Sequence, residues 1–466
     1  MTGLHARTCI ASGRTGAVAA GSSAAAAVGA EALRDGGNAF DAAVAAALTE
    51  TVALPSKCGL AGDLVALVVT PGHAEPRSLI ALGGAAAGLY DAAAAVDWKV
   101  PPTGPLSVGI PGAPAGYADL AARGRLTLTR LAAPAIELAR AGMWWSPINA
   151  VLEAESRQLL ATYQPEGCRY SPRSGAHSVG DTVALPGLAL ALEEFVARGA
   201  ELFHHGPLAD AVVSTVARHG GVVDNADLRT ARADEQIALD SRIAGDDTRA
   251  LWVTHRPTYG VALADVLAKT PPSDMTPAAV AESLALLNRG ELGTDEGTST
   301  VAAADSEGNA VVIVHSNSFP RYGSGIVVQD YDLVLSNRAG RGFTFAPDHP
   351  NSPLPGRRPL TTLHAWGVRH DEGWLLGATP GGQQQVPWNA QLLGLLLSGP
   401  QTLDPDRLSD ALTMPRWLLD ADGSVRMEGG DMRPLSARSS HTLVRTSPDD
   451  LTAAADPRWD STAVAV

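Results

Sequence analysis

Hydrophobic and polar positions divide the chain into a helix-rich first part and a strand-rich last part. The first 50 residues are alanine-rich and helix-like, with a break at Gly36-Gly37 that is typical of a helix end, and Asp35 or Asn38 is suited to cap the adjoining termini. The run 63–72 is apolar from Leu64 to Val69 and ends in a turn, which predicts a strand. Further helices are predicted at about 113–123, 128–142, 186–198, 207–219 and 271–290, and the stretch 220–260 combines turns with short strands.

The pattern changes at residue 298. Two strand-like runs, 298–305 and 310–318, flank the turn sequence "SEGN". Residues 325–337 predict two more strands, 360–379 predict a hairpin around "RHDEG", and 384–399 return to helix. The glycine-rich, acidic segment 290–297 joins the two parts, and no long linker separates them. We therefore expect one intertwined unit.

Composition narrows the classes of function. The 466 residues include 35 Lys and Arg against 49 Asp and Glu, a formal net charge of −14 with no basic block, which argues against nucleic acid binding. The alanine-rich stretch 18–32 includes Ser22, Ser23 and Glu31 and is too polar for a membrane span. The first residues lack a basic region followed by an apolar one, so we expect a cytoplasmic protein without a membrane partner.

The sequence offers no metal or cofactor motif. Cys9, Cys58 and Cys168 are widely spaced and match neither a disulfide framework nor a zinc pattern. The adjacent histidines of "FHHG" (203–206) point in different directions in either a strand or a helix, which argues against a shared metal ion. The chain also contains no P-loop, G-x-S-x-G or H-E-x-x-H sequence, so we predict neither cofactor nor metal.

A cluster of three hydroxyl residues, Thr298, Ser299 and Thr300, directly follows Gly297. Such residues are common in strands, and an ordinary strand start is one interpretation. The other is a threonine that supplies its own base, because cutting the preceding bond exposes an α-amino group with a pKa of about 7.7–8.0. That chemistry requires a small residue before the threonine and a strand after it. Both interpretations fit the residues alone.

Several motifs, in order, resemble the γ-glutamyltransferase family of N-terminal-nucleophile hydrolases. The resemblance covers nearly the whole chain: residues 16–68, "GIPGAPAGY" (109–117), "GGVVDNADL" (220–228), "TSTVAAADSEGNAVVIVHSNS" (298–318), "GSGIVV", "PLTT" and "TPGG". It implies a four-layer αββα sandwich, made as one proenzyme that cuts itself between Gly297 and Thr298. The expected products are a helix-rich large subunit, 1–297, and a strand-rich small subunit, 298–466. They would remain together as a heterodimer, and pairing of such heterodimers is left open.

The same resemblance implies roles for individual residues. Thr298 is the expected nucleophile, with Thr300 as the reserve candidate, and Ser316 in "VHSNS" supplies a hydroxyl that assists it and the self-cleavage. The remaining expected site residues are Gly381 and Gly382 of "TPGG" for the oxyanion, and Thr361 and Thr362 of "PLTT" for the substrate carboxylate.

The sequence departs from the glutathione-using members at the glutamate-recognition positions. Pro102 stands where those members have a carboxylate-binding arginine, and proline cannot make that charged, two-pronged bond. Arg338 and Arg341 stand where acids that grip the substrate's amino group are expected, and Ser318 replaces an asparagine. The two arginines are expected to repel an ammonium group and to attract a carboxylate or keto acid. We therefore do not expect glutathione as the substrate.

Three functions follow as hypotheses. The first is a self-cleaving hydrolase that uses Thr298 to cleave an amide-type acyl bond in a small, anionic, carboxylate-bearing compound, as the resemblance to oxamate amidohydrolases implies. The second is a carbon–carbon bond hydrolase that removes an oxalyl group in the biosynthesis of natural products with 4-alkyl-proline units. The third is an uncut, non-catalytic scaffold.

Overall fold

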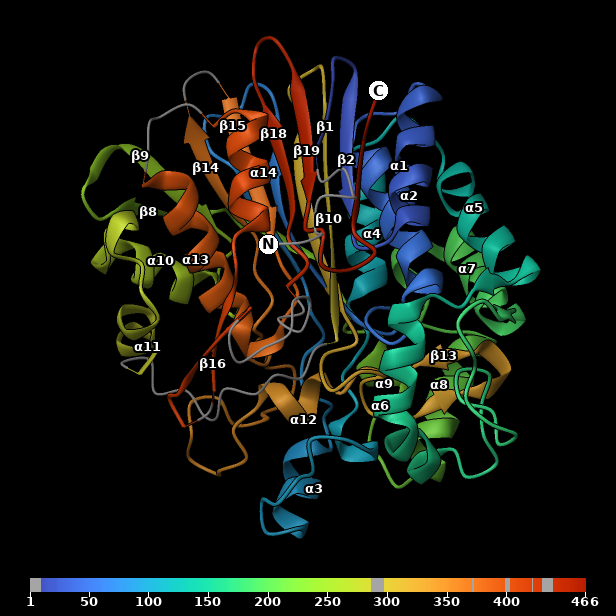
Figure 1. Cartoon of the computed structure of the whole chain (residues 1–466). Coiled ribbons are helices and arrows are strands. Elements are labelled where there is room, and N and C mark those ends of the chain that lie inside the picture. Colours follow the sequence, from blue (N-terminus) through green and yellow to red (C-terminus); the bar gives the residue numbers. More distant parts are fainter. Residues whose placement is uncertain (1–9, 286–296, 371–372, 399–402, 421, 430–438) are drawn as a thin grey trace.

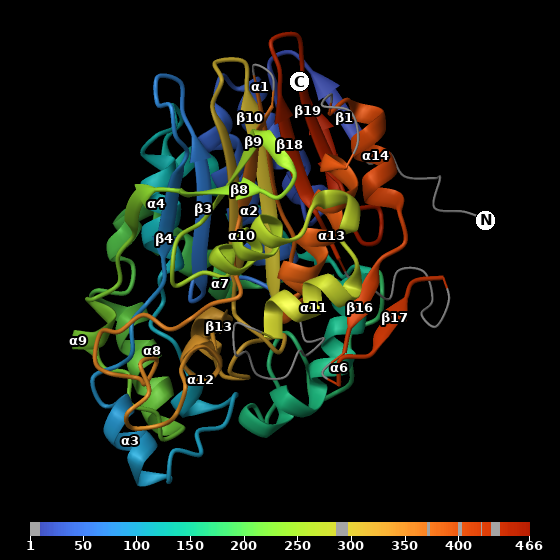
Figure 2. The same cartoon turned by 90° about the vertical axis from the view of Figure 1, so that its left-hand side faces the viewer.

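The protein is arranged in four layers, with two β-sheets stacked face to face and helices on both outer faces (Figure 1). This computed structural model describes residues 10–285, 297–370, 373–398, 403–420, 422–429 and 439–466. The order of the layers is the αββα order expected from the sequence resemblance. Figure 2, turned by 90°, shows helices α10 (Gly260–Lys269), α11 (Pro277–Ala285) and α13 (Gln385–Leu397) lying in front of the sheets.

The first sheet places strands from both ends of the chain beside the strand that begins at Thr298. Its seven antiparallel strands follow the order β20 (Thr462–Ala465), β2 (Gly16–Ala20), β10 (Thr298–Asp305), β11 (Ala310–Ser316), β3 (Asp63–Val69), β4 (Arg77–Ala81) and β7 (Asp234–Ile237). The two predicted fragments therefore alternate within one sheet.

The second sheet is interleaved in the same way. Its seven strands follow the order β1 (Ile10–Gly13), β19 (Leu451–Ala455), β18 (Thr442–Thr446), β15 (Gly373–Ala378), β14 (Trp366–His370), β9 (Asp246–Val253) and β8 (Leu239–Ile243). Both fragments thus share every sheet of the sandwich, so separating them would break main-chain hydrogen bonds as well as side-chain contacts.

Small apolar side chains fill the space between the sheets. Alternate residues of a strand point to opposite faces. In β10, Ala302 and Ala304 belong to the core between the sheets, whereas Val301 and Ala303 belong to the core beneath the helices. The facing sheet contributes side chains such as Leu376, Ala378, Val444 and Ala453. By this alternation, the even-numbered residues of β10, Thr298 included, point between the sheets.

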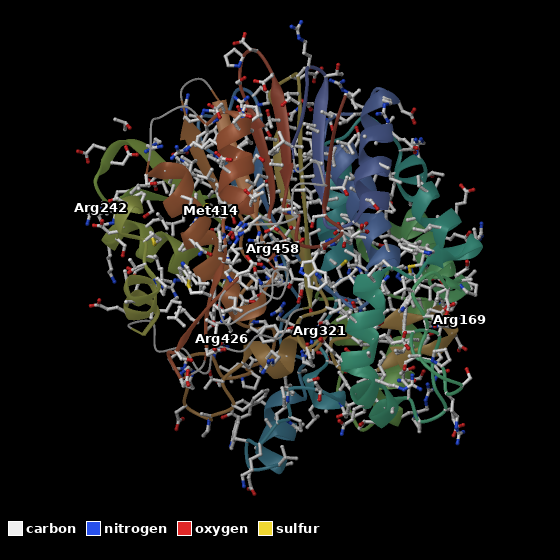
Figure 3. The ribbon with its side chains drawn as sticks, in the orientation of Figure 1. Arg169, Arg242, Arg321, Met414, Arg426 and Arg458 are labelled. Carbon is white, nitrogen blue, oxygen red and sulfur yellow. The ribbon has the colours of Figure 1, made fainter. Side chains whose placement is uncertain are left out.

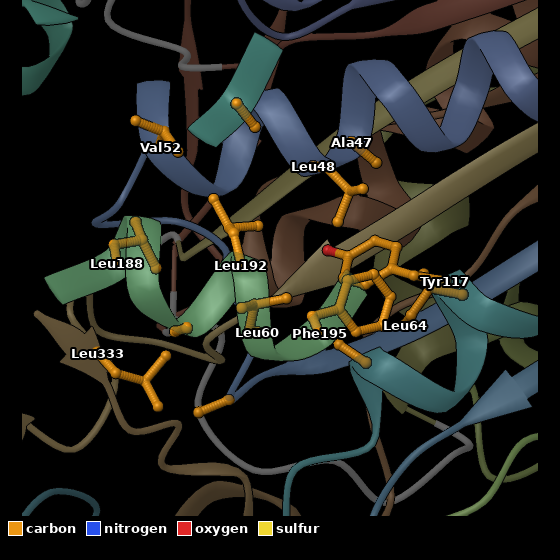
Figure 4. Packing of buried hydrophobic residues seen from close by; sticks show 14 of the residues in the cluster. Ala47, Leu48, Val52, Leu60, Leu64, Tyr117, Leu188, Leu192, Phe195 and Leu333 are labelled. Atoms are coloured by element: carbon orange, nitrogen blue, oxygen red, sulfur yellow. The ribbon is translucent and has the colours of Figure 1, made fainter. Parts of the chain in front are cut away.

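The helices on the first sheet pack through alanine and leucine. Helix α2 (Ala39–Ala53) is buried on nearly all sides, which its run of alanines permits because small side chains let other elements approach closely. Asn38 and Asp41 form a capping box at its start, so the chain turns sharply after the Gly36-Gly37 break. Figure 4 shows Tyr117 of α4 (Ala113–Ala121) and Phe195 of α7 (Pro186–Arg198) beneath α2, where the two rings meet edge to face with their centroids 6.2 Å apart.

The remaining helices complete the two outer layers. On the first sheet lie α1 (Ser23–Arg34), α4 (Ala113–Ala121), α5 (Leu128–Ala141), α7 (Pro186–Arg198) and α8 (Pro207–Arg218). On the second lie α10 (Gly260–Lys269), α11 (Pro277–Ala285), α13 (Gln385–Leu397) and α14 (Pro405–Thr413). The other elements are the long helix α6 (Pro147–Tyr163), the short helices α3 (Leu89–Ala95), α9 (Asn225–Leu228) and α12 (Arg338–Gly342), and the two-stranded pairs β5–β6 (Met143–Trp144, Thr182–Val183), β12–β13 (Val327–Val328, Leu333–Val334) and β16–β17 (Trp417–Leu419, Val425–Met427).

Most predicted elements are confirmed, with one clear error. The predicted helices at 113–123, 128–142, 186–198 and 207–219 and the predicted strand at 63–72 match α4, α5, α7, α8 and β3. The expectation that the first 50 residues are helical is wrong for 10–20, which form β1 and β2. Short alanine-valine runs suit either state, and pairing with β10 and β20 decides for strand. The predicted helix 271–290 is described only up to residue 285, and the predicted joining segment lies outside the described residues except for Gly297.

Some charged side chains extend into solvent, whereas others are buried with partners. Arg169 and Arg242 extend from the rim of the molecule, whereas Arg458 lies near its middle (Figure 3). Arg458 forms ion pairs there with Asp456 and Glu428. Its guanidinium also donates to the carbonyls of Leu412 and Met414 at the C-terminal end of α14. In the part of the chain that is described, no helix combines the length and apolarity that crossing a bilayer requires.

Candidate active site

Thr298 and Ser316 face each other at the ends of two neighbouring strands. Thr298 is the first residue of β10 and Ser316 the last of β11, and the antiparallel register pairs them directly. Their hydroxyl oxygens are 3.0 Å apart, and both side chains are buried. The two residues predicted to act together are therefore in hydrogen-bond contact, on the face that points between the sheets.

Ser316 also contacts the bond that is predicted to be cut. Its hydroxyl donates to the carbonyl oxygen of Gly297 at 2.6 Å and accepts from the main-chain N–H of Ser318 at 2.8 Å. A serine hydroxyl has one proton to donate and two lone pairs. Because that proton goes to Gly297, the Thr298 hydroxyl is the donor in the Thr298–Ser316 contact.

Gly297 occupies a position that admits no side chain. A Cβ atom there would lie 1.6 Å from the carbonyl oxygen of Ser318, far inside contact distance. The residue before Thr298 must therefore be glycine, because the chain that follows Ser316 leaves no room for a Cβ atom. Ser318 itself has a left-handed backbone (φ 69°), a conformation uncommon for residues other than glycine.

The "TPGG" turn is tied to β10 by a chain of hydrogen bonds. Thr300 donates to the carbonyl of Ser440 at 3.4 Å, and the N–H of Ser440 donates to the Thr379 hydroxyl at 3.2 Å. Gly381 and Gly382 closely follow Thr379 and have φ values of 137° and 53°. Thr300 and Thr298 lie on the same face of β10, so this turn comes to the side of the sheet where Thr298 points.

The "PLTT" segment lies between the "TPGG" turn and helix α12. Leu360 donates its N–H to the carbonyl of Gly342, the last residue of α12, at 3.1 Å. Thr362 contacts Gln385, the first residue of α13 after the glycine pair. Thr361 and Thr362 are buried, and the Thr361 hydroxyl accepts from the N–H of Leu363. The two threonines are thus near the other predicted residues, and the Thr361 hydroxyl is bonded to the main-chain N–H of Leu363.

Arg341 packs on the chain that follows β11. Its guanidinium stacks over the ring of Phe319 with 4.2 Å between the guanidinium carbon and the ring centroid, and Nε donates to the Phe319 carbonyl at 3.1 Å. Phe319 is the residue after Ser318. Arg341 is therefore fixed close to the strand end that carries Ser316, by a cation–π contact and a hydrogen bond.

Arg338 is engaged in a buried ion pair that the sequence interpretation missed. Its Nε donates to Oδ2 of Asp63 at 2.7 Å, and both side chains are almost fully buried. Asp63 therefore neutralises the positive charge of Arg338, a partner that the sequence did not indicate. Burial raises the pKa of the Asp63 carboxyl, and the neighbouring Arg338 offsets part of that rise.

Pro102 lies beside this pair, where the resemblance expects an arginine in glutathione-using members. Its carbonyl accepts from the amide nitrogen of Asn337 at 2.6 Å, and Asn337 directly precedes Arg338. The loop with Pro102 and the start of α12 therefore meet. The loop thus has Pro102 in place of an arginine, but α12, the helix that this loop contacts, begins with Arg338.

A second buried network lies on the opposite face of the same strands. His315 donates or accepts through both ring nitrogens, with Glu50 Oε2 at 2.7 Å from Nε2 and the Tyr117 hydroxyl at 2.7 Å from Nδ1. Glu50 also accepts the N–H of Gly21 at 2.6 Å. Burial, with the Glu50 charge nearby, raises the pKa of the Cys58 thiol and of Tyr117. The ligand atoms of Glu50, Cys58 and His315 lie within 4.8 Å of one another, the kind of spacing a metal ion uses, but both nitrogens of His315 are already hydrogen-bonded.

Sequence reasoning therefore missed Asp63 and the Glu50–His315 pair. Asp63 begins a strand whose other residues are apolar, and Glu50 lies in an almost entirely apolar helix. A lone charged residue in an apolar element is rarely buried without a partner. That signal was available in the sequence, although the identity of each partner was not.

The four layers, with two antiparallel sheets between helices, give the chain the fold class of the N-terminal-nucleophile hydrolases. Solved structures agree on the fold: the cephalosporin acylase from Bacillus halodurans aligns with a TM-score of 0.84 over 99% of this chain and 97% of that protein, at 24% sequence identity.

The family follows from the sequence comparison. A model of the Gamma-glutamyltranspeptidase family matches residues 25–285 and 268–466, so the chain belongs to that family. Among curated relatives, the oxamate amidohydrolase proenzyme of Klebsiella pneumoniae subsp. pneumoniae is 26% identical over 85% of this chain and 84% of its own length. The glutathione hydrolase proenzyme of Escherichia coli is 24% identical over 82% of this chain and 77% of its own. The chain is thus an enzyme of the hydrolase and transferase type.

Proposed function

We propose that the protein is a self-processing amide hydrolase in which Thr298 is first the agent of chain cleavage and then the catalytic nucleophile. The contact between the hydroxyls of Thr298 and Ser316, with Ser316 also bonded to the Gly297 carbonyl, is the observation that carries this proposal. The relatives named as proenzymes support a cut into two chains.

The self-cleavage step follows from the hydroxyl bonds. The Thr298 oxygen attacks the Gly297 carbonyl carbon, and its proton passes to Ser316 as Ser316 gives its own proton to the Gly297 oxygen, which forms a neutral tetrahedral intermediate. The Gly297–Thr298 C–N bond then breaks, the nitrogen takes up the proton of the new hydroxyl as the C=O bond re-forms, and an ester remains on the threonine. Water hydrolyses the ester, which leaves the Gly297 carboxylate and a free α-amino group on Thr298.

The mature enzyme uses that new amine as its base. With an ordinary pKa of about 7.7–8.0, part of it is unprotonated near neutral pH and accepts the Thr298 hydroxyl proton, directly or through water. The hydroxyl oxygen attacks the substrate carbonyl, and the main-chain amides of Gly381 and Gly382 bind the oxyanion. The amine product leaves with the proton, and water then releases the acyl group from Thr298.

The proposed substrate is a small carboxylate-bearing compound. Arg338, Arg341, Thr361 and Thr362 surround the strand ends through the contacts described above and would bind the anionic part. Pro102 in place of an arginine argues against glutathione. The relatives named as an oxamate amidohydrolase and as acylases support an amide as the bond that is cleaved. Residues 1–297 and 298–466 would function as a heterodimer, without metal or cofactor, in the cytoplasm.

A second candidate reaction uses the same residues. If the leaving carbon is stabilised as an enamine or enolate, Thr298 could cleave a carbon–carbon bond and release an oxalyl group, as in pathways to 4-alkyl-proline units. Arginines at the site, in place of the expected acids, favour an anionic fragment of this kind. Release of ammonia supports the amidase, and release of oxalate without ammonia supports the alternative.

Denaturing electrophoresis and intact mass test the central proposal. Purified protein should give two polypeptides divided between Gly297 and Thr298, and Thr298→Ala should remain whole. Thr300→Ala is the matched control, because Thr300 hydrogen-bonds to Ser440 and Thr442 and not to the predicted scissile bond, and it should still be cut. A single uncut wild-type chain would instead support the scaffold hypothesis.

A further inference from the structure

Thr379 holds the first peptide group of the "TPGG" turn through both hydrogen bonds of its hydroxyl. The residue directly follows β15, and its side chain is completely buried. Its hydroxyl accepts the N–H of Ser440 at 3.2 Å and donates to the carbonyl of Pro380 at 3.0 Å. Because a hydroxyl has a single proton, that proton serves the Pro380 carbonyl alone. Thr379 therefore fixes the direction in which this carbonyl points.

The direction of the Pro380 carbonyl sets the direction of the Gly381 N–H. The peptide bond between the two residues is trans, and in a planar trans peptide group the C=O and N–H bonds point to opposite sides. The Gly381 N–H therefore points away from the Thr379 hydroxyl. Gly381 has a φ of 137°, and glycine restricts its own backbone less than other residues do. The hydrogen bond from Thr379 thus restrains a peptide plane that the glycine itself leaves free.

The next peptide group is held in the same way. The Gly381 carbonyl accepts the N–H of Gln384 at 2.8 Å, so the Gly382 N–H points to the opposite side. Both glycines are buried, and in the part of the chain that the structure describes neither N–H donates to an acceptor. Buried N–H groups without a partner are rare in folded proteins. Two in succession, each with its carbonyl bonded on the other side, indicate that their acceptor comes with the substrate.

The Thr379 hydroxyl is in turn anchored to the strand of the nucleophile. Ser440, which donates its N–H to Thr379, accepts the Thr300 hydroxyl at its carbonyl oxygen, with 3.4 Å between the two oxygens. Thr300 lies two residues after Thr298 on the same face of β10. The position of the Pro380 carbonyl is therefore set relative to β10 by two hydrogen bonds through one residue, Ser440.

We propose that Thr379 is a positioning residue that aims the Gly381 N–H at the oxyanion by holding the Pro380 carbonyl. The inference rests on the proposed function, in which this N–H binds the oxyanion, and adds the side chain that sets its direction. Thr379 acts through the peptide group and does not itself donate to the oxyanion, because its one proton is used. Without the hydroxyl the peptide plane can rotate, and the donor is misaligned when charge develops.

The test measures acylation of Thr298 in the self-cleaved protein by 4-nitrophenyl acetate, an ester that needs no carboxylate recognition. The Thr298 oxygen bonds to the acetyl carbon, its proton passes to the free α-amino group, and 4-nitrophenolate leaves as the oxyanion collapses. Stopped-flow absorbance gives the rate of the first turnover, and intact mass verifies one acetyl group on fragment 298–466. We expect Thr379→Val, which keeps the shape but removes the hydroxyl, to lower this rate about 10- to 100-fold, within the cost of losing one oxyanion donor.

Rescue and a matched control separate positioning from packing. Thr379→Ser keeps the hydroxyl and should be acylated within about threefold of the wild-type rate, although it loses a methyl group from the core. Thr442→Val removes an equally buried hydroxyl, one that donates to Thr300 at 3.0 Å and not to Pro380, and should match wild type in the same range. Equal rates for Thr379→Val and Thr379→Ser would overturn the inference, and so would an equal loss in Thr442→Val.

A second readout keeps this inference separate from the proposed function. Cleavage before Thr298 depends on Ser316 and not on this turn, so it should be complete in all three variants, and an uncut, folded Thr379→Val would overturn the inference. If Thr379→Val does not accumulate, Thr379→Ala replaces it and should be acylated about tenfold or more slower than Thr379→Ser. Wild-type protein that is not cut, or not acetylated on Thr298, would overturn the proposed function together with this inference. Equal rates for wild type and Thr379→Val would overturn the inference alone.

Discussion

The hydroxyl of Ser316 lies 2.6 Å from the carbonyl oxygen of Gly297, although 19 positions separate the two residues in the chain. The antiparallel pairing of β10 with β11 produces this contact, because it returns the chain to the point where β10 began. A donor fixed on a carbonyl oxygen before reaction costs no reorganisation as charge develops there. The relationship gives the most direct predictions for self-cleavage.

Replacing Ser316 should slow self-cleavage without preventing folding. Ser316→Ala removes the donor to the Gly297 oxygen, and loss of one such donor typically costs about 10²–10³ in rate. The fraction cut, followed over time by electrophoresis after synthesis, measures the change. Ser316→Thr keeps the hydroxyl and should cut much faster than the alanine variant. Equal rates for the two would show that the hydroxyl has no role.

Enlarging Gly297 should block the cut for a steric reason. The Cβ of Gly297→Ala would lie 1.6 Å from the Ser318 carbonyl oxygen, so the strand end must shift and the Gly297 carbonyl loses its alignment with Ser316 and Thr298. We expect little or no cleavage by intact mass. Gly88→Ala is the matched control, because its new Cβ makes only an ordinary contact of 3.4 Å with Val222. Normal processing of Gly297→Ala would refute this account of the glycine.

Changing Gly381 should separate the two reactions. Gly381 has a φ of 137°, and a Cβ added there would lie only 2.5 Å from the Trp388 ring, so Gly381→Ala should distort the "TPGG" turn. We expect kcat for amide hydrolysis to fall about 10²–10³-fold, as for loss of an oxyanion donor. Self-cleavage should continue, since Ser316 and not this turn contacts the Gly297 oxygen. Loss of both reactions together, in a folded protein, would contradict the assignment.

Removing Glu50 should destabilise the strands that carry the site. Glu50→Leu leaves the Gly21 N–H and the His315 ring buried without their partner, at a cost of about 1–3 kcal/mol for each group. Thermal unfolding of the cleaved protein should show a clearly lower Tm. Asp265→Asn, an exposed change, should leave the Tm nearly unaltered. An unchanged Tm for Glu50→Leu would mean that the network contributes little.

His441 should make the protein sensitive to mild acid. Burial, together with the charges of Arg416 and Arg458, holds the pKa of this imidazole well below its usual range. Below about pH 6.5 the His441 imidazole therefore binds a proton in the unfolded chain but stays neutral in the folded protein, and the free energy of unfolding decreases as the pH falls. The loss is at most about 1.4 kcal/mol per pH unit for one such group. His441→Leu should flatten the decline between about pH 6.5 and 5, measured by denaturant unfolding; an unaltered slope would count against it.

The sequence by itself determined the elements and the order of the motifs. Short runs of apolar and β-branched residues located β3, β10 and β11, and helical periodicity located α4, α5, α7 and α8. The order of the motifs placed Thr298 directly after Gly297 at the start of a strand. These features are local, because a period of two or 3.6 and a glycine before a hydroxyl can be read within a few residues. The family, too, followed from motifs that lie along the chain.

Tertiary structure decided which residues meet. Whether "GAVAA" is helix or strand depended on β10 and β20, which lie far along the chain but beside it in the sheet. The pairing of Arg338 with Asp63 was not predicted, since no local pattern indicates that an acid 275 positions earlier lies beside the arginine. Ion pairs and hydrogen bonds act over a few ångströms of space, and only the folded sheet brings such distant positions within that range.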